Sequence, residues 1–174
     1  MRGISVLLVA AMALAVSTAA AQGVVTWQRA DIPHSPTVSL DTLGPVAKVP
    51  GAPGAVFARL RALYRQLGVR PEVDDSARGR IGSLEIIRTQ QFAGGWMSRI
   101  VECGRAPSGG PLADNARVQL SIVTFVGAAD GDSTSVRTGL VGTARSNDGS
   151  SLSTATCASR GYVELWLRRQ LGGT

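Results

Sequence analysis

Two stretches of the chain carry apolar residues at the spacing of an amphipathic α-helix, one near each end of the folded part. Residues 55–68 read AVFARLRALYRQLG, with an apolar stripe at Val56, Leu60, Leu63, Tyr64 and Leu67. Gly68 follows, at the position where a helix cap favours positive φ. The second stripe is formed by Val163, Trp166, Leu167 and Leu171. Ser159 precedes it as a candidate N-cap, so the pattern predicts a second helix there.

Between these two helices the pattern changes to the alternation of β-strands. Residues 117–127, RVQLSIVTFVG, alternate apolar and polar positions, and residues 133–144, STSVRTGLVGTA, do the same. The intervening AADGD has the composition of a hairpin turn. A shorter segment, LSTATC at 152–157, is also β-permissive. These segments predict consecutive antiparallel strands.

A further hairpin is expected around Gly94-Gly95. Residues 81–92 read as a strand, and two glycines tolerate the positive φ that primed turns require. In that register Ala93 faces Trp96 and Ile86 faces Cys103. Strands grouped between helices indicate the α+β class. We therefore expect an antiparallel sheet of about five strands packed against an N-terminal and a C-terminal helix.

The first twenty-one residues have the three parts of a secretory signal peptide. Arg2 gives a positive start, residues 4–16 are mostly apolar, and Ala19 and Ala21 precede a cut before Gln22. The apolar stretch is shorter than the about 20 residues of a membrane-spanning helix, although an uncleaved N-terminal anchor is the alternative. We expect export to the periplasm or beyond the cell. An extended, proline-containing lead-in (22–52) and one α+β domain (53–174) follow.

Charge and cysteine content add two expectations. The chain has 18 basic and 12 acidic residues, and after the predicted signal peptide the arginines are scattered from Arg29 to Arg169, unlike a nucleic-acid-binding patch. The two cysteines of an exported chain favour a disulfide between Cys103 and Cys157. Closing that loop stabilises a fold by about 4 kcal/mol in the chain-entropy treatment. The alternative is a reactive thiolate at Cys157, activated by the helix that follows.

Candidate chemistry is sparse. His34 is the only histidine and lies in the proline-rich DIPHSP, so no metal set is predicted and no cofactor is expected. Carboxylates offer one catalytic alternative, in which the Asp74-Asp75 pair works with Glu85 or Glu102 as acid and base. The simpler interpretation of DDSARGR is a turn. Trp96, beside the predicted turn, is a candidate contact for a partner or ligand.

The stretch VFARLRALYRQLGVRPEVDDSARGRIGSLE, residues 56–85, resembles the opening of BamC-type, helix-grip domains of bacterial envelope proteins. The similarity is carried by five residues: Gly68, Asp74, Asp75, Gly79 and Ile81. The chain departs from that pattern because it has no lipidation cysteine and because Cys103 and Cys157 are not part of it. The resemblance implies an envelope-associated, non-enzymatic accessory or binding domain.

The sequence thus predicts an exported, non-catalytic domain that binds an envelope protein or a small apolar ligand. A carboxylate-dependent hydrolase and a purely structural secreted module are the alternatives. Carboxylates converging in a cleft favour the enzyme. An apolar hollow between helix and sheet favours binding.

Overall fold

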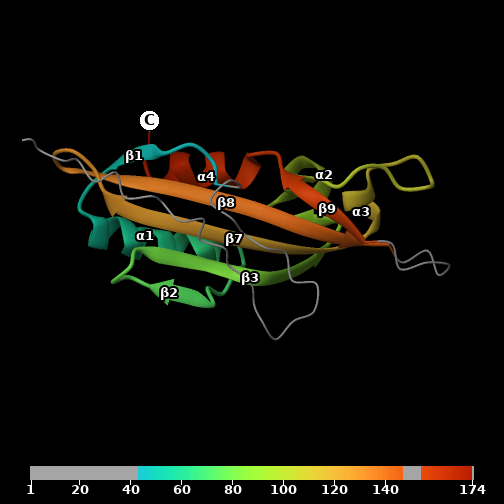
Figure 1. Ribbon diagram of the computed structural model, residues 1–174, viewed down its shortest axis with the longest axis horizontal. Helices are drawn as coiled ribbons and strands as arrows, with labels where there is room; N and C mark the ends of the chain where they lie inside the picture. Colours follow the sequence, from blue (N-terminus) through green and yellow to red (C-terminus); the bar gives the residue numbers. More distant parts are fainter. Residues whose placement is uncertain (1–42, 147–153, 174) are drawn as a thin grey trace, which may run out of the picture.

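The computed structural model describes residues 43–146 and 154–173 (Figure 1). In chain order the elements are β1 (Ala47–Pro50), α1 (Pro53–Gln66), β2 (Val73–Asp75), β3 (Arg80–Thr89), β4 (Gln91–Phe92), β5 (Gly95–Trp96), α2 (Met97–Ile100), β6 (Val101–Glu102), α3 (Leu112–Asn115), β7 (Arg117–Ala128), β8 (Ser133–Arg145), β9 (Thr154–Ser159) and α4 (Tyr162–Gln170). The predicted signal peptide (1–21) and the lead-in up to residue 42 lie outside the described residues.

The main sheet has seven strands in the order β2-β3-β7-β8-β9-β6, and β1 also pairs with β8. Every pairing in it is antiparallel. Its centre is the long β7–β8 hairpin, which runs in one register from Arg117 opposite Arg145 to Ala128 opposite Thr134. The predicted α+β class and the antiparallel sheet are therefore confirmed. The sheet is wider than the expected five strands because short segments extend it.

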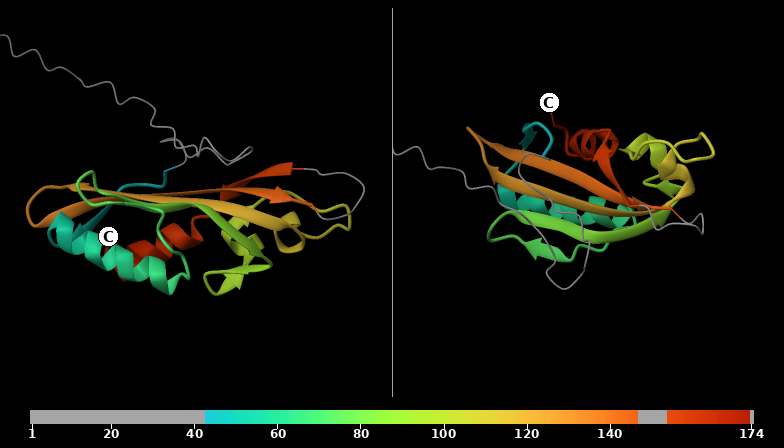
Figure 2. Two further views of the ribbon diagram at one scale, coloured as in Figure 1. Left: turned by 90° about the horizontal axis from the view of Figure 1, so that it is seen from below. Right: turned by 45° about the vertical axis from the view of Figure 1, so that its right-hand side comes forward.

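The alternation along β7 decides which face of the sheet becomes the core. Val118, Leu120, Ile122 and Thr124 are buried on one face, where α1 and α4 lie next to each other (Figure 2). The helices contribute the apolar stripes that the sequence indicates, and Leu60, Tyr64, Val163 and Leu167 are buried. On the opposite face Val123 and Val141 form a smaller buried cluster with Leu84 and Phe125.

One long strand, β8, is shared by two short neighbours on the same edge. β1 pairs with its beginning, from Ala47 opposite Val136 to Pro50 opposite Ser133. β9 pairs with its end, from Val141 opposite Ala158 to Arg145 opposite Thr154. Between these ladders the described chain makes one isolated bridge, Leu43 to Gly139. The segment before β1 thus runs beside the middle of β8, where Gly44 also bonds Thr138, and it forms one side of the site described below.

The predicted hairpin at Gly94-Gly95 is wrong by one residue. The turn residues are Ala93 and Gly94, with φ of 51° and 76°, so Phe92 pairs with Gly95 and Gln91 with Trp96. Because Ala93 accepts the positive φ of a primed turn, the ladder shifts by one place. The hairpin also ends early, since Met97 begins the short helix α2.

The strand before that hairpin consequently has a different partner from the one expected. Ile86 lies opposite Leu120 of β7, not opposite Cys103. The long alternating β7 pairs with β3 from Arg80 to Thr89, with one register shift between Ser83 and Ile86. A hairpin interrupted by α2 offers no pairing of that length.

The disulfide between Cys103 and Cys157 is confirmed, with Cα atoms 4.2 Å apart. Glu102 of β6 pairs with Ala158 of β9, so the next residues in the antiparallel register face each other. The bridge ties the edge strand β6 to β9, and β9 leads directly into α4. Within the described ranges no helix is both long and apolar enough to span a bilayer.

Candidate ligand-binding site

A pocket of about 110 Å³ lies against β8 at Val136 and Thr138, beside the segment that leads into β1. It lies between α4 and the strands β1 and β8, and its wall is mostly apolar. The lining residues are Gly44, Pro45, Ala47, Val136, Thr138, Gly161, Glu164, Leu165 and Arg168. An apolar hollow with a few polar groups is the usual form of a small-molecule site.

Small residues in the entering chain keep this pocket open. Gly44 donates its backbone N–H to the carbonyl of Thr138 at 2.8 Å, which holds the chain beside β8. A Cβ at Gly44 would lie 3.0 Å from that carbonyl oxygen and 3.9 Å from Cγ of Glu164. Ala47 contributes only a methyl group where β1 faces α4. Larger side chains at either position would occupy part of the hollow.

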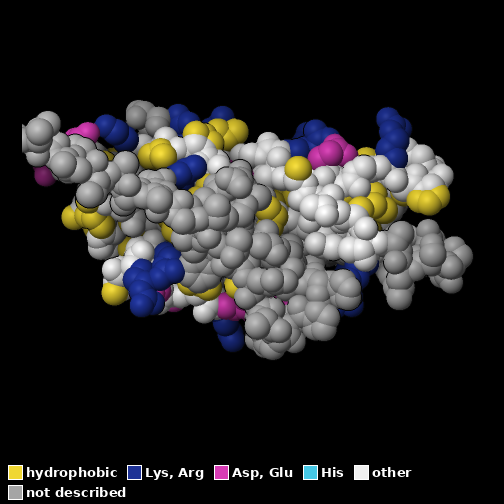
Figure 3. All heavy atoms as spheres, viewed as in Figure 1, with side chains coloured by type: hydrophobic (Ala, Val, Ile, Leu, Met, Phe, Trp, Pro, Cys, Tyr) yellow, Lys and Arg dark blue, Asp and Glu magenta, His cyan; other side chains and the backbone are white. Residues whose placement is uncertain are grey.

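Exposed hydrophobic side chains gather around the same region. The described residues include four large hydrophobic side chains that are exposed, and three of them belong to this part of the molecule: Val46 (54%), Leu165 (48%) and Tyr162 (38%). Val46 sits between the lining residues Pro45 and Ala47, and Leu165 itself lines the pocket. Figure 3 shows hydrophobic side chains beside Lys and Arg over β1 and α4. A clustered apolar surface of this kind marks interaction sites.

Glu164 brings a carboxyl group into this wall from the first turn of α4. Its Oε1 accepts a hydrogen bond from the Ser159 hydroxyl, and that hydroxyl oxygen accepts the N–H of Gly161 at 3.0 Å. Its Oε2 is buried and has no hydrogen-bond partner among the described residues. Burial raises the pKa of Glu164, against the opposing effect of the Ser159 hydrogen bond.

Ser159 thus orients Glu164, although the sequence suggested a different role for it. The helix begins at Tyr162, and its N-cap residue is Gly161 in the left-handed conformation, with φ of 76°. Glycine reaches this φ without strain, so the chain can turn sharply from β9 into α4. The predicted cap at Ser159 is therefore two residues early.

A buried chain of hydroxyl groups reaches the pocket from the other helix. Tyr64 of α1 lies 2.9 Å from the Thr124 hydroxyl, and Thr124 lies 2.9 Å from the hydroxyl of Thr138. Tyr64 also donates to the carbonyl of Ile81 at 3.3 Å. Desolvation raises the pKa of Tyr64, so its hydroxyl stays neutral. The chain ends at Thr138, which lines the pocket.

Arg168 is the cation of the pocket wall, one helical turn after Glu164. Its side chain is half-buried, and it makes no hydrogen bond or ion pair with any part of the chain that the structure describes. Arg168 and Glu164 are therefore both in the wall, but each has bonding capacity that its neighbours do not use. Neither residue was identified from the sequence. The signal was present as polar side chains four residues apart beside the apolar stripe of α4.

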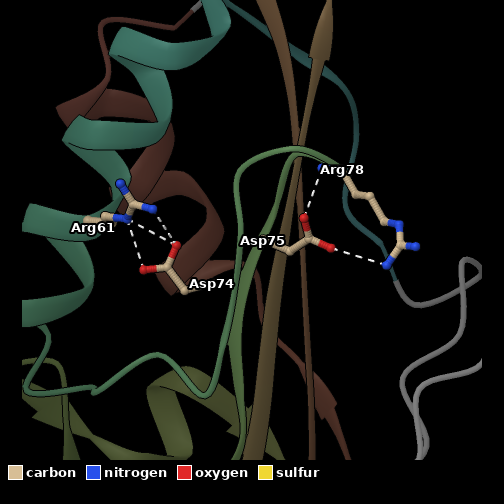
Figure 4. Close-up of polar contacts among 4 residues, drawn as sticks. All are labelled: Arg61, Asp74, Asp75 and Arg78. Atoms are coloured by element: carbon tan, nitrogen blue, oxygen red, sulfur yellow. Dashed lines mark hydrogen bonds and ion pairs between the residues drawn. The ribbon is translucent and has the colours of Figure 1, made fainter.

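Asp74 and Asp75, two of the carboxylates proposed from the sequence for catalysis, are each held by arginine. The Arg61 guanidinium donates from Nε and Nη2 to Asp74, at 2.8 and 2.7 Å (Figure 4). Asp75 accepts the backbone N–H of Arg78 at 3.0 Å and lies 3.5 Å from its guanidinium. The DDSARGR segment is thus a turn stabilised by ion pairs, as the simpler interpretation predicts.

A third candidate, Glu85, lies on β3, the neighbour of β2, where the β3–β7 register shifts. The fourth, Glu102, lies at the other side of the sheet and forms an ion pair with Arg160. Strands β2 and β6 are the two ends of the strand order, five steps apart. At about 4.8 Å per step, Asp74 and Glu102 are on the order of 24 Å apart along the sheet. Paired catalytic carboxylates stand within about 10 Å of each other. Asp74 and Glu102 therefore do not form one site.

Trp96, the predicted contact residue, is 52% exposed at the start of α2 and does not line the pocket. Within the described ranges no group of three or more His, Cys, Asp or Glu could hold a metal ion. His34 lies outside those ranges. Comparison with known proteins finds no matching family model, no matching curated protein and no matching solved structure.

Proposed function

We propose that the chain is an exported, non-catalytic, envelope-associated domain that binds a small apolar ligand in the pocket between α4, β1 and β8. One observation carries the proposal: the hollow is apolar, lies between helix and sheet, and has the exposed hydrophobic side chain of Leu165 in its wall. This is the arrangement that favours binding over catalysis. Trp96 remains a candidate contact for an envelope protein on a separate surface.

Export and envelope association rest on the sequence. The signal-peptide pattern of residues 1–21 supports export, and disulfides form and persist mainly in oxidising compartments outside the cytosol. The resemblance to BamC-type domains stays a prediction. Whether or not the BamC-type resemblance holds, we propose that the sheet and the helices packed against it form the frame of the binding site. The hydrolase alternative has less support, since Asp74 and Glu102 are engaged by arginines at opposite edges of the sheet and none of the candidate carboxylates lines the pocket.

Binding of a neutral apolar probe tests this function. An engineered apolar cavity of about 150 Å³ takes up benzene or xenon, so a pocket of this size accepts an apolar group of a few heavy atoms. We expect saturable benzene binding to the purified chain, measured by calorimetry and by the rise in melting temperature. Ala47→Leu fills the hollow from β1 and is expected to abolish the binding.

Two variants complete the design. Ala158→Leu adds the same atoms to an exposed position of β9 and should leave benzene binding unchanged. Leu165→Ser removes an exposed wall residue with little effect on folding and should weaken binding at least several-fold. If the folded wild-type chain binds no benzene, or if Ala47→Leu and Leu165→Ser bind it as well as wild type, the proposed function is wrong and the purely structural alternative gains.

A further inference from the structure

We propose that the ligand of this pocket is an amphiphilic anion, a short alkyl chain carrying a carboxylate or a phosphate ester, whose charged head binds Arg168. This inference rests on the proposed function and adds the chemistry of the ligand to it. The apolar lining would contact the alkyl chain of the ligand, and the Arg168 cation in the wall would bind its anionic head group.

The main observation is that the Arg168 side chain is unpartnered within the described part of the molecule. A half-buried arginine side chain normally donates several hydrogen bonds, yet that of Arg168 has no hydrogen-bond or ion-pair partner in the described ranges. Its side chain lies in the wall of an apolar hollow, where a carboxylate or phosphate can accept two parallel N–H bonds. The neighbouring helix position is also cationic, since Arg169 follows in the last turn of α4.

Glu164 is the alternative residue for binding a charged head group, which would then be a cation. The geometry of its carboxyl group argues against this role. An ammonium head would have to reach the free Oε2, but that atom is buried inside the helix–sheet interface. Its other oxygen is engaged by the Ser159 hydroxyl. Glu164 therefore has no accessible oxygen to offer to a cationic head without a rearrangement, whereas the Arg168 side chain is partly exposed.

The size of the pocket limits the source of the anion. A volume of about 110 Å³ holds the end of one short alkyl chain and not the two long chains of a membrane lipid. The exposed Leu165, which lines the pocket, can cover the part of the alkyl chain that projects from the hollow. We therefore expect a free, single-chain amphiphile and not a lipid in a bilayer.

The test compares three probes that share one alkyl chain: octanoate, octanol and octylamine, each below its micelle concentration and titrated calorimetrically. We expect octanoate to bind the purified chain about tenfold or more tighter than octanol, in line with one charge-assisted hydrogen-bonding interaction. Octylamine should bind most weakly. Raising the salt concentration should weaken octanoate binding and leave octanol binding nearly unchanged.

Variants of adjacent arginines locate the head group. Arg168→Gln should reduce octanoate affinity to that of octanol and leave octanol affinity unchanged. Arg169→Gln, one position along on the exposed side, should keep at least half of the octanoate preference. A preference for octylamine, an octanoate preference that survives Arg168→Gln, or binding to anionic phospholipid vesicles without binding to octanoate would overturn the inference. Octanol and benzene binding without any octanoate preference would also overturn it and would leave the proposed function intact.

Discussion

Thr124 on β7 stands directly opposite Thr138 on β8, and their hydroxyl oxygens lie 2.9 Å apart inside the core. Tyr64 of α1 extends this pair by a further hydrogen bond of 2.9 Å. The three hydroxyls cross the apolar layer from the first helix to the wall of the pocket. A buried polar chain of this kind is tolerated only when its members bond one another.

Replacing Tyr64 by Phe removes the hydroxyl at the inner end of this chain. We expect the free energy of unfolding to fall by about 1–2 kcal/mol, because Thr124 and the Ile81 carbonyl each lose a partner in a buried setting. Urea denaturation measures the change. Tyr162→Phe, at an exposed position, should alter stability by less than about 0.5 kcal/mol. Equal effects for the two variants would mean that the buried chain contributes nothing.

Glu164 gives the fold a pH dependence of a definite sign. Its pKa is raised in the folded state, so between its unfolded pKa of about 4.3 and its folded pKa the folded chain binds more protons than the unfolded chain. The stability that this group contributes is full below the unfolded pKa and is lost as the pH rises through the folded pKa. The groups around it are the Ser159 hydroxyl, the Tyr64 hydroxyl and Arg168.

Glu164→Gln should remove this dependence. We expect the variant to be more stable than wild type at pH 7 and similar to it near pH 4, in thermal denaturation curves recorded across that range. Asp132→Asn, an exposed carboxylate in the β7–β8 turn, serves as the control and should not change the slope. A wild-type chain that gains stability from pH 4 to pH 7 relative to Glu164→Gln would contradict the assignment.

Loss of the disulfide should be the most costly single change. The bridge closes a separation of 54 residues, for which the chain-entropy treatment gives about 4 kcal/mol. We expect the double variant Cys103→Ala, Cys157→Ala to unfold at a much lower urea concentration than wild type. A reducing agent should destabilise the wild-type chain and leave the stability of the double variant unchanged. Thiol titration of the denatured, unreduced wild-type chain should find no free thiol. Two free thiols would refute the bridge.

Asp74 should behave as a surface ion-pair residue and not as a catalytic one. Its bond to Arg61 is bidentate, but both side chains are exposed by about two fifths, so solvent screens the pair and it contributes little to stability. Asp74→Asn should therefore lower stability slightly and leave benzene and octanoate affinities unchanged. A large loss of binding on this substitution would place the site at the wrong end of the sheet.

The regular elements were accessible from the sequence because their signals are periodic. Strands β7 and β8, the stripes of α1 and α4, and the cysteine pair all follow from local patterns that the long-range packing reinforces. The hairpin near Gly94 shows where such patterns stop being decisive. Ala93 takes a positive φ that is unusual for a residue with a Cβ, and the turn moves by one place.

The pocket could not be found in the same way. It forms where α4 lies over β8 and over the segment that enters β1, a meeting of distant segments that leaves no local pattern in the sequence. Its polar groups come from segments that are distant in the chain: Thr138 in a strand, and Glu164 and Arg168 in the last helix. In the sequence, these two residues look like the ordinary solvent-exposed face of a helix. Only the structure shows that they line a pocket.

The account depends on the hollow between α4, β1 and β8 being a binding site, and methyl NMR tests this most directly. During a titration with octanoate, we expect saturable shifts of the methyl signals of Ala47, Val136 and Leu165, and no such shifts in Ala47→Leu at Val136 and Leu165. Unchanged signals at these residues, or shifts confined to the opposite face at Val123 and Val141, would contradict it.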